Sequence, residues 1–565
     1  REIDPDEILI DSKNVSEFDT DQFEGRIERP LSRRSLAGAG AILLVVAALL
    51  LLRAADLQVW EGAAYAKQAR ENQLEHTVLF AERGVVEDRT GRPLAWNERP
   101  PAEALPGQAG TSTSVGFSTR IYAAYRGVAH VLGYAKAPAK DSSGFYFRDT
   151  FEGIDGAEKA FDSILKGQNG LTLTETDARG KVVSQAAIQP PEQGQKLVLS
   201  VDARVSQGLY DILAVRARDA RAQGAAGVVM DVRTGELLAL TSYPEYSSSA
   251  LAGGDSAAIN AYNADKHLPF LNRATDGLYA PGSIVKPLMA AAALAEGVID
   301  EHKQLLSTGQ LVVPNPYDPE KPTIFKDWRV NGWTDARRAI AVSSDIYFYE
   351  VGGGFESQPG LPAQAGLGIA RIDQYLRLFG FGADAGLAGY SEVDGTIPTP
   401  EWKAANFPQD PLWRIGDTYH TAIGQYGTLV TPLQAARMIA TIANGGVLLT
   451  PSLIASTTPQ GKQLAVDAHA LQVAREGMRL GVTEGIAGAV NLPFVHVAAK
   501  TGTAQVGARN ENQNAWMVGF WPYEQPKYAY AVVLEKMPAG TPIGGSVVMS
   551  DFFYYLEANA PQYLQ

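Results

Sequence analysis

The sequence predicts an α+β fold with one membrane-spanning helix, a linking module and a larger C-terminal module. Residues 36–52 form an uninterrupted apolar run, near the shortest length that spans a bilayer. Within residues 222–565, strand-like pairs stand at both ends and helical segments lie between them, which is typical of an α+β domain. A chain of 565 residues is also long enough for several domains.

The N-terminal residues predict an acidic cytoplasmic tail, 1–33, and a transmembrane anchor, 34–55. Nine carboxylates among the first 24 residues, with few apolar side chains, are typical of a mobile tail. Four arginines precede the apolar run, and positive charge marks the cytoplasmic end of a membrane helix, so the C-terminal bulk would be exported. A cleaved signal peptide is the alternative, because Ala54-Ala55 follows the run.

The linking module is predicted over residues 56–221 and contains both strand and helix patterns. Residues 54–75 indicate a juxtamembrane helix, and residues 76–88 indicate a strand. Further strands and helices are expected to follow as far as residue 221, and no repeat of solenoid period is present.

The C-terminal module, residues 222–565, begins with two strands around a turn at Arg233-Thr234-Gly235. This pattern favours a β-hairpin, although a parallel pairing would give the same string. Near the C-terminus we expect a second strand pair and a final helix, at residues 515–521, 528–534 and 547–556.

Composition excludes several kinds of site. The chain has no cysteine, which rules out disulfides, thiolate catalysis and cysteine-based zinc sites. Its seven histidines are scattered without ligand spacing, and phosphate-binding signatures are missing, so no metal or cofactor is expected. The net charge of −13 gives no reason to expect binding to nucleic acid.

Three short motifs follow one another in the C-terminal module. They are Ser283-Ile284-Val285-Lys286, Ser343-Ser344-Asp345 and Lys500-Thr501-Gly502. Each pattern alone has decoys, such as Ser163-Ile164-Leu165-Lys166, but only the set that starts at Ser283 has all three in order. Ser163 lies within a helical run, where a serine is usually just solvated.

The first motif predicts a nucleophile and its base. Pro281 and Gly282 precede an apolar stretch that indicates a buried helix, so Ser283 should lie in its first turn. Residues i and i+3 share a helix face, which brings the Lys286 amine within reach of the hydroxyl. A serine needs such a base, and a lysine acts as one only when burial or a second cation lowers its pKa from about 10.4. A simple helix cap is the alternative interpretation of Ser283.

The second motif could move a proton and hold substrate. The Ser343 hydroxyl, lying between two ammonium groups, can relay a proton to the leaving amine. Asp345 could bind a substrate amide or orient a lysine. An ordinary helix cap remains the alternative for both residues.

The third motif follows a strand-like run. Lys500 is the candidate second cation and supplies charge for a terminal carboxylate, while Thr501 and Thr503 supply hydroxyls. Gly502 permits close approach of another backbone, expected to be that of the substrate. The backbone N–H groups of Ser283 and Thr503 would form the oxyanion hole.

With these motifs the chain resembles class B penicillin-binding proteins, and more narrowly penicillin-binding protein 2, the elongation-type D,D-transpeptidase. The resemblance runs from about residue 36 to the C-terminus. Division-type relatives usually carry Asn at the position of Asp345, whereas elongation-type enzymes have Ser-x-Asp followed by Tyr-Phe-Tyr. Further similar segments include Arg83-Gly84-Val85-Val86-Glu87-Asp88-Arg89-Thr90-Gly91, Gly153-Ile154-Asp155-Gly156-Ala157-Glu158, Lys326-Asp327-Trp328, Gly416-Asp417-Thr418 and Gly424-Gln425.

The resemblance implies a penicillin-binding transpeptidase fold, with an antiparallel sheet between helices and Lys500 on one of its strands. It implies cross-linking of peptidoglycan stem peptides through an acyl-enzyme on Ser283, and inhibition by β-lactams. It also implies a single-pass protein of the bacterial inner membrane, with an extracytoplasmic catalytic domain and a SEDS-family glycan polymerase as partner. The linking module would be the dimerisation-like pedestal of the family.

One departure from the family concerns the head of the linking module. Only about twenty residues, Glu98 to Phe117, stand where the family has a long insertion, and their Pro, Gly, Ala, Ser and Thr content indicates a loop. Contact with a polymerase through that head is therefore in doubt. The alternative functions are a membrane-anchored β-lactam sensor, a division-type transpeptidase, a hydrolytic β-lactamase and a non-catalytic scaffold.

Overall fold

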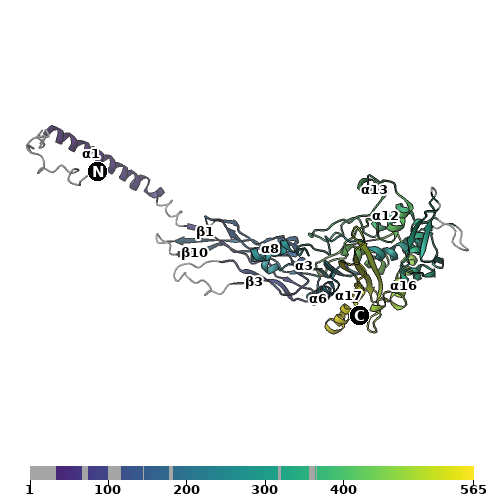
Figure 1. Cartoon of the computed structure of the whole chain (residues 1–565). Helices are drawn as coiled ribbons and strands as arrows, with labels where there is room; N and C mark the ends of the chain where they lie inside the picture. Colours follow the sequence, from purple (N-terminus) through teal and green to yellow (C-terminus); the bar gives the residue numbers. More distant parts are fainter. Residues whose placement is uncertain are drawn as a thin grey trace, which may run out of the picture. The chain divides into compact units, whose positions relative to one another are not determined.

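The structure is a computed structural model (Figure 1), and it divides the chain into two compact units. The first contains Arg1–Thr77 and Leu173–Ala186, and the second contains Val78–Thr172 and Ala187–Gln565. The structure describes residues 33–65, 74–99, 116–143, 145–176, 182–315, 318, 320–354, 363 and 365–565.

The first unit contains the predicted membrane helix. Helix α1 (Arg33–Ala55) continues into the π-helical turn η3 (Asp56–Trp60), and the stretch Leu36–Trp60 is long and apolar enough to cross a membrane. Its large apolar side chains are exposed, which is costly in water and suits lipid. The predicted helix to residue 75 is wrong at its end, because β1 (Leu74–Leu79) already begins at residue 74.

The acidic tail and the shortened head fall largely outside the described residues. Of the tail, only Arg33 belongs to them; of the head, residues 98, 99, 116 and 117 do. The predicted strand over residues 76–88 is two separate strands, β1 and β2 (Val86–Glu87).

The linking part of the second unit is built on a four-stranded sheet in the order β11-β2-β3-β4. Its other strands are β3 (Pro93–Glu98), β4 (Thr119–Tyr122) and β11 (Leu197–Val198). A buried charge cluster ties this sheet to the short helices α4 (Gly156–Ala160) and α5 (Asp162–Leu165): Arg83 and Arg120 both pair with Glu158, which is fully buried. Two guanidinium groups compensate the desolvated carboxylate.

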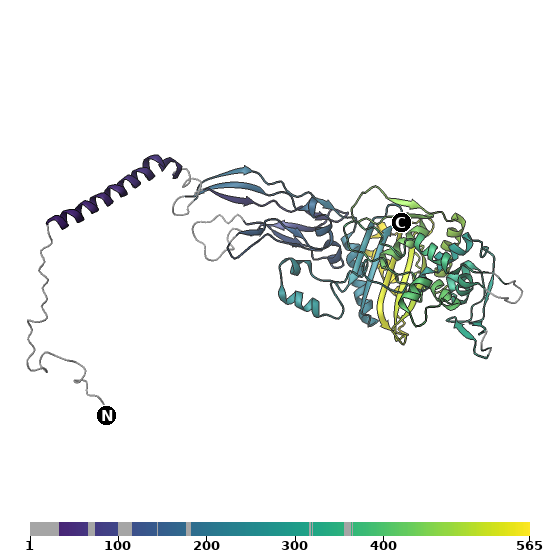
Figure 2. The same ribbon diagram turned by 90° about the horizontal axis from the view of Figure 1, so that it is seen from above.

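The catalytic part contains a five-stranded, wholly antiparallel sheet in the order β13-β12-β22-β21-β20. Both predicted strand pairs are present, and Figure 2 shows strands from the two ends of the module lying side by side. β20, which carries Lys500, is an edge strand. The strands are β12 (Gly224–Asp231), β13 (Leu237–Tyr243), β20 (Ala498–Val506), β21 (Asn512–Trp521) and β22 (Tyr528–Pro538).

Helices cover both faces of this sheet, as expected for an antiparallel sheet between helices. Successive side chains of a strand point to opposite faces, so Val228 packs with α15 (Pro432–Ala443), whereas Val229 packs with α6 (Ala203–Asp219) and α17 (Gly545–Asn559). The last of these helices confirms the one predicted at residues 547–556.

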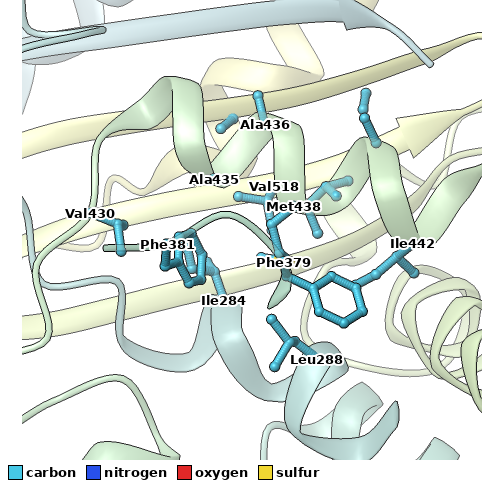
Figure 3. Packing of buried hydrophobic residues seen from close by; sticks show 14 of the residues in the cluster. Ile284, Leu288, Phe379, Phe381, Val430, Ala435, Ala436, Met438, Ile442 and Val518 are labelled. Atoms are coloured by element: carbon cyan, nitrogen blue, oxygen red, sulfur yellow. The ribbon is translucent and has the colours of Figure 1, made fainter. Parts of the chain in front are cut away.

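The core on the α15 side fixes the helix that follows Ser283. Figure 3 shows Ile284 and Leu288 packed among Phe379, Phe381 and side chains of α15 and β21. Residues 284–293 are fully buried, so η4 (Gly282–Val285) and α9 (Lys286–Ala295) are held by hydrophobic contact along their length. The predicted buried helix is therefore present, with a 3-10 turn at its start.

The remaining elements surround this core. The longer helices are α8 (Ser256–Ala264), α10 (Ala336–Val342), α11 (Asp345–Gly353), α12 (Gly368–Leu378), α13 (Pro400–Asn406), α14 (Ile415–Ala422) and α16 (Ala468–Thr483). Small strand pairs near the site are β14 (Leu305–Ser307) with β17 (Gly332–Thr334), and β15 (Gln310–Val313) with β16 (Thr323–Lys326). Elsewhere lie α3 (Ala129–Leu132), α7 (Ser248–Ala252), β5 (Ala135–Lys136), β6 (Ala139–Lys140), β7 (Tyr146–Arg148), β8 (Glu152–Gly153), β9 (Gly170–Thr176), β10 (Val182–Gln189), β18 (Val447–Leu449) and β19 (Gly461–Gln463).

Candidate active site

Ser283 lies in the 3-10 turn η4, partly exposed, between buried neighbours. Side chains at i and i+3 eclipse one another in a 3-10 helix, so Lys286 stands on the same face as Ser283. The turn is held from outside by Gly424, whose carbonyl accepts the Gly282 N–H at 2.8 Å. A Cβ on Gly424 would lie 2.3 Å from the Gly282 carbonyl oxygen, so only glycine permits this approach.

The Lys286 amine is completely buried and points at the second motif. Its Nζ donates to Asp345 Oδ1 at 2.7 Å and to the Ser343 carbonyl oxygen at 2.9 Å, and lies 3.3 Å from Ser343 Oγ. Within the described residues it makes no hydrogen bond to Ser283, in contrast to the simplest expectation from the i, i+3 spacing. A carboxylate is the stronger acceptor for an ammonium group, which accounts for the orientation.

Ser343 joins the two lysines. Its Oγ accepts from Lys500 Nζ at 2.8 Å as well as from Lys286, which fills both lone pairs and leaves the hydroxyl proton free to be donated. Its backbone is left-handed, with φ 57°, which is costly for a residue with a Cβ. The cap of α11 is instead Ser344, whose Oγ accepts the Tyr347 N–H, so the Ser343 side chain is free for another role.

The Lys500 amine is also buried, and it donates to the Thr501 carbonyl oxygen at 2.7 Å. Burial holds the pKa of Lys500 well below its usual range, the nearby Lys286 ammonium lowers it further, and the Asp345 carboxylate opposes both effects. A lysine in this position can hold a neutral amine more readily than a surface lysine. Lys500 is thus a second candidate base, which the sequence interpretation did not assign.

Strand β20 presents the third motif along the free edge of the sheet. The Lys500 side chain and the Gly502 position face one side of the strand, while the side chains of Thr501 and the exposed Thr503 face the other side. A Cβ on Gly502 would lie 2.7 Å from Ile284 Cγ2, so the close neighbour of this glycine is the Ser283 turn itself. The expectation that Gly502 also makes room for the substrate backbone stays a prediction.

The expected oxyanion hole lies where backbone N–H groups are free to donate. An edge strand leaves alternate N–H groups without a partner in the sheet, and the first N–H groups of a helical turn have no acceptor within the turn. The N–H groups of Ser283 and Thr503 belong to these two settings. Their role stays a prediction.

The decoy motif has a different environment. Ser163 lies in the four-residue helix α5 and is exposed, as the helical run predicted. Its side chain and that of Lys166 make no hydrogen bond to any part of the chain that the structure describes. The converging lysines are thus a feature of the Ser283 set.

Comparison with known proteins agrees with this geometry. A family model described as the penicillin-binding protein transpeptidase domain matches residues 225–549, and one described as the penicillin-binding protein dimerisation domain matches residues 107–199. The chain belongs to the penicillin-binding proteins.

Among penicillin-binding proteins the chain belongs to the class B, elongation-type group, penicillin-binding protein 2. It is 32% identical to peptidoglycan D,D-transpeptidase MrdA of Escherichia coli K12, over 76% of this chain and 70% of that protein. It is 30% identical to MrdA of Haemophilus influenzae, over 77% of this chain and 69% of that protein. Peptidoglycan D,D-transpeptidase FtsI of Escherichia coli K12 is 27% identical to this chain, over 76% of this chain and 65% of that protein.

Solved penicillin-binding proteins share the fold. The structure of PBP2 from Pseudomonas aeruginosa in complex with WCK 5153 has a TM-score of 0.67 and 28% identity, and covers 86% of this chain and 96% of that one. The structure of the complex between PBP2 and MreC from Helicobacter pylori has a TM-score of 0.69 and 26% identity, and covers 86% of this chain and 100% of that one.

Asp327 is a residue of this penicillin-binding protein to which the sequence interpretation assigned no role. It follows β16 and accepts hydrogen bonds from Ser344, Ser307 and Asn331. Its only sequence signal was the Lys326-Asp327-Trp328 segment, which contributed to the family resemblance without indicating a function. Within the ranges given above, no group of three or more His, Asp or Glu side chains could hold a metal ion.

Proposed function

We propose that this penicillin-binding protein is a peptidoglycan D,D-transpeptidase that cross-links stem peptides during cell elongation. The observation that carries the proposal is the convergence of two buried lysine amines, from α9 and β20, on the hydroxyl of Ser343. That arrangement provides proton transfer near the partly exposed hydroxyl of Ser283, which makes no hydrogen bond within the described residues. A scaffold would not need two buried amines.

In the first half-reaction, Ser283 Oγ attacks the penultimate D-alanine carbonyl of a stem ending in D-Ala-D-Ala. Its proton passes to a neutral amine, that of Lys286 or Lys500, and the tetrahedral intermediate collapses as the C–N bond breaks. The terminal D-alanine leaves after its nitrogen receives a proton through the Ser343 hydroxyl. The products are an acyl-enzyme and free D-alanine.

In the second half-reaction, an amine of a neighbouring stem attacks the ester on Ser283. It loses its proton by the same route, and the Ser283 oxygen regains one as the ester breaks. The product is a new amide cross-link, and the enzyme is restored. The N–H groups of Ser283 and Thr503 would stabilise the oxyanion in both steps, while Thr501 and Thr503 hold the substrate carboxylate.

Labelling of full-length protein with a fluorescent penicillin tests the proposal. We expect covalent labelling of the wild type and none of Ser283→Ala. Ser163→Ala is the matched control, because it alters the serine of the exposed S-x-x-K decoy and should label as the wild type does. Labelling of Ser283→Ala at the wild-type rate would contradict the assignment.

The persistence of the label separates a transpeptidase from a hydrolase. A β-lactamase releases hydrolysed penicillin within seconds, whereas a transpeptidase blocked by a β-lactam should keep its label for the time of a cell generation. Rapid loss of label from the wild type would favour the hydrolytic alternative.

For the anchor, we propose that the tail of residues 1–33 is cytoplasmic and that residues 56–221 and 222–565, the pedestal and transpeptidase modules, lie outside the membrane. The apolar exposed helix α1 and the arginines before it support this orientation. Because the chain has no cysteine, Ser12→Cys and Ser249→Cys give clean labelling sites. A membrane-impermeant maleimide should label only Ser249→Cys in spheroplasts, and the reverse pattern would overturn the orientation.

We further propose a SEDS-family glycan polymerase as a membrane partner. A chain in the structure titled a peptidoglycan synthase complex aligns with 92% of this chain at a TM-score of 0.70 and 26% identity, and that title concerns coordination of polymerization and crosslinking. Co-purification from mild detergent with a polytopic membrane protein is expected. Exchange of α1 for an unrelated apolar helix should weaken it, and unchanged capture would exclude a role for α1.

A further inference from the structure

The turn that carries Ser343 is held by a short segment from a distant strand pair. Asp327 and Trp328 follow β16 directly and contact the turn on both sides of Ser343. Trp328 Nε1 donates to the carbonyl oxygen of Val342 at 3.2 Å, just before Ser343. Asp327 Oδ2 accepts from Ser344 Oγ at 2.8 Å, just after it.

The Asp327 carboxylate is saturated by donors. Besides Ser344, its Oδ2 accepts from Ser307 Oγ at 2.9 Å, Asn331 Nδ2 at 3.1 Å and the Ile346 N–H at 3.3 Å, and its Oδ1 accepts the Trp328 N–H at 2.8 Å. Both oxygens of Asp327 thus act as acceptors. An asparagine would place an NH₂ group against donors in either orientation of its amide.

The Ser344 hydroxyl transmits this restraint to the helix that carries Asp345. Its oxygen accepts the Tyr347 N–H as the cap of α11, so its single proton goes to Asp327. Ser344 is completely buried, which leaves no water to replace that acceptor. The start of α11 is therefore tied to the end of β16.

We propose that Asp327, together with Trp328, is a positioning residue that holds the left-handed Ser343 turn so that the Ser343 hydroxyl meets both lysine amines. This inference rests on the proposed function, since it assigns a role in that reaction. Left-handed backbone at a non-glycine residue persists only when its surroundings enforce it. Contacts to Val342 and Ser344 supply that enforcement from either side.

The test compares acylation by a fluorescent penicillin in full-length wild type, Asp327→Asn and Trp328→Phe. Loss of the restraint should slow acylation by Asp327→Asn roughly 10- to 100-fold, because displacing a reacting group by about 1 Å has effects of this size. Trp328→Phe keeps an aromatic ring at this exposed position and removes the Nε1–H donor, so a drop of several fold is expected even if Asp327→Asn folds poorly. Asp373→Asn, at a surface ion pair with Arg377 on α12, is the matched control.

Two readouts distinguish positioning from a merely structural effect. The pH midpoint of acylation should shift in folded Asp327→Asn, because moving Ser343 changes the surroundings of Lys500. Asp327→Asn and Ser344→Ala both break the contact between these two side chains, so the loss in the double variant should be smaller than the product of the two single losses. Effects that multiply, or a wild-type rate and pH midpoint in Asp327→Asn, would overturn the inference. Failure of the proposed function is separate, since wild type would then not be acylated at Ser283.

Discussion

At the scale of single residues, the site is organised by which amines and oxygens share one buried pocket. The Lys286 amine contacts both Ser343 and Asp345, and the Lys500 amine approaches the Ser343 hydroxyl from the sheet. Two ammonium groups so close together repel one another, and burial removes the water that would screen them. The Asp345 carboxylate offsets part of that repulsion, so its charge sets how readily a proton leaves the pocket.

Replacing Asp345 by Asn should therefore change the pH dependence of acylation. The carboxylate raises the pKa of Lys500, so its removal lowers that pKa further and moves the acid limb of the pH–rate profile to lower pH. The maximal rate should also fall, because Lys286 then faces a neutral amide oxygen in place of the carboxylate that accepts its hydrogen bond at 2.7 Å. Stopped-flow acylation across pH 5–10 measures both effects, and a shift of the limb to higher pH would contradict this account.

Replacing Ser343 by Ala should slow acylation roughly 100-fold, the lower end of the range for a lost proton-transfer group. The removed hydroxyl bridges Lys286 and Lys500, and alanine gives neither an acceptor nor a donor there. Equal loss of transpeptidation and of penicillin acylation is expected, since both use the same proton route. A rate within twofold of the wild type would exclude the relay.

At the scale of elements, the nucleophile depends on how closely the turn η4 approaches the edge strand β20. Gly502 is the point of contact, because a Cβ there would lie 2.7 Å from Ile284 Cγ2 and 3.0 Å from the Pro281 carbonyl oxygen. Ile284 is itself anchored in the core shown in Figure 3. A side chain at position 502 would therefore displace strand β20 and not the anchored turn η4.

Gly502→Ala should therefore slow acylation roughly tenfold or more while leaving the unfolding temperature nearly unchanged, because an edge strand can shift without opening the sheet. Gly488→Ala is the control, since a Cβ there meets only one atom, at 3.9 Å. Acylation rates and thermal unfolding of both variants check the prediction. Wild-type acylation by Gly502→Ala would mean that this contact does not set the geometry of the site.

Local patterns were enough to predict the elements and their residues. Pro281-Gly282 before an apolar run marked the start of the Ser283 helix, and the apolar strings on either side of Arg233-Thr234-Gly235 predicted the β12–β13 hairpin. The partners of each side chain could not be predicted this way, because Lys286 bonds to residues 57 and 59 positions away. The role of Asp327 was missed for the same reason, since its contacts depend on the packing of three separate segments.

At the scale of the whole catalytic unit, the linking part is joined to the transpeptidase part by a titratable contact. Both carboxylate oxygens of Glu245 accept backbone N–H groups of the linking part, from Gly127 at 2.7 Å and Ala129 at 3.0 Å. Tyr390 adds a hydrogen bond of 2.6 Å to the Val131 carbonyl oxygen. Burial raises the pKa of Glu245 to about 7, because desolvation outweighs these two hydrogen bonds.

This contact should make stability depend on pH. Between about pH 4.5 and pH 7 the unfolded chain loses a proton that the folded chain keeps at Glu245, so wild-type stability falls as pH rises through this window and levels off above it. Glu245→Gln lacks this component. Its unfolding temperature relative to the wild type should therefore rise from pH 4.5 to pH 8, and parallel curves for the two proteins would contradict the assignment.

The central claim is that the hydroxyl of Ser283 becomes covalently acylated beside two buried lysines. Peptide mapping by mass spectrometry, after full-length protein has reacted with penicillin, tests it most directly. The account predicts one adduct, on the peptide that contains Ser283, and its absence after prior treatment with another β-lactam. An adduct on Ser343, Ser163 or any other residue, with Ser283 unmodified, would contradict it.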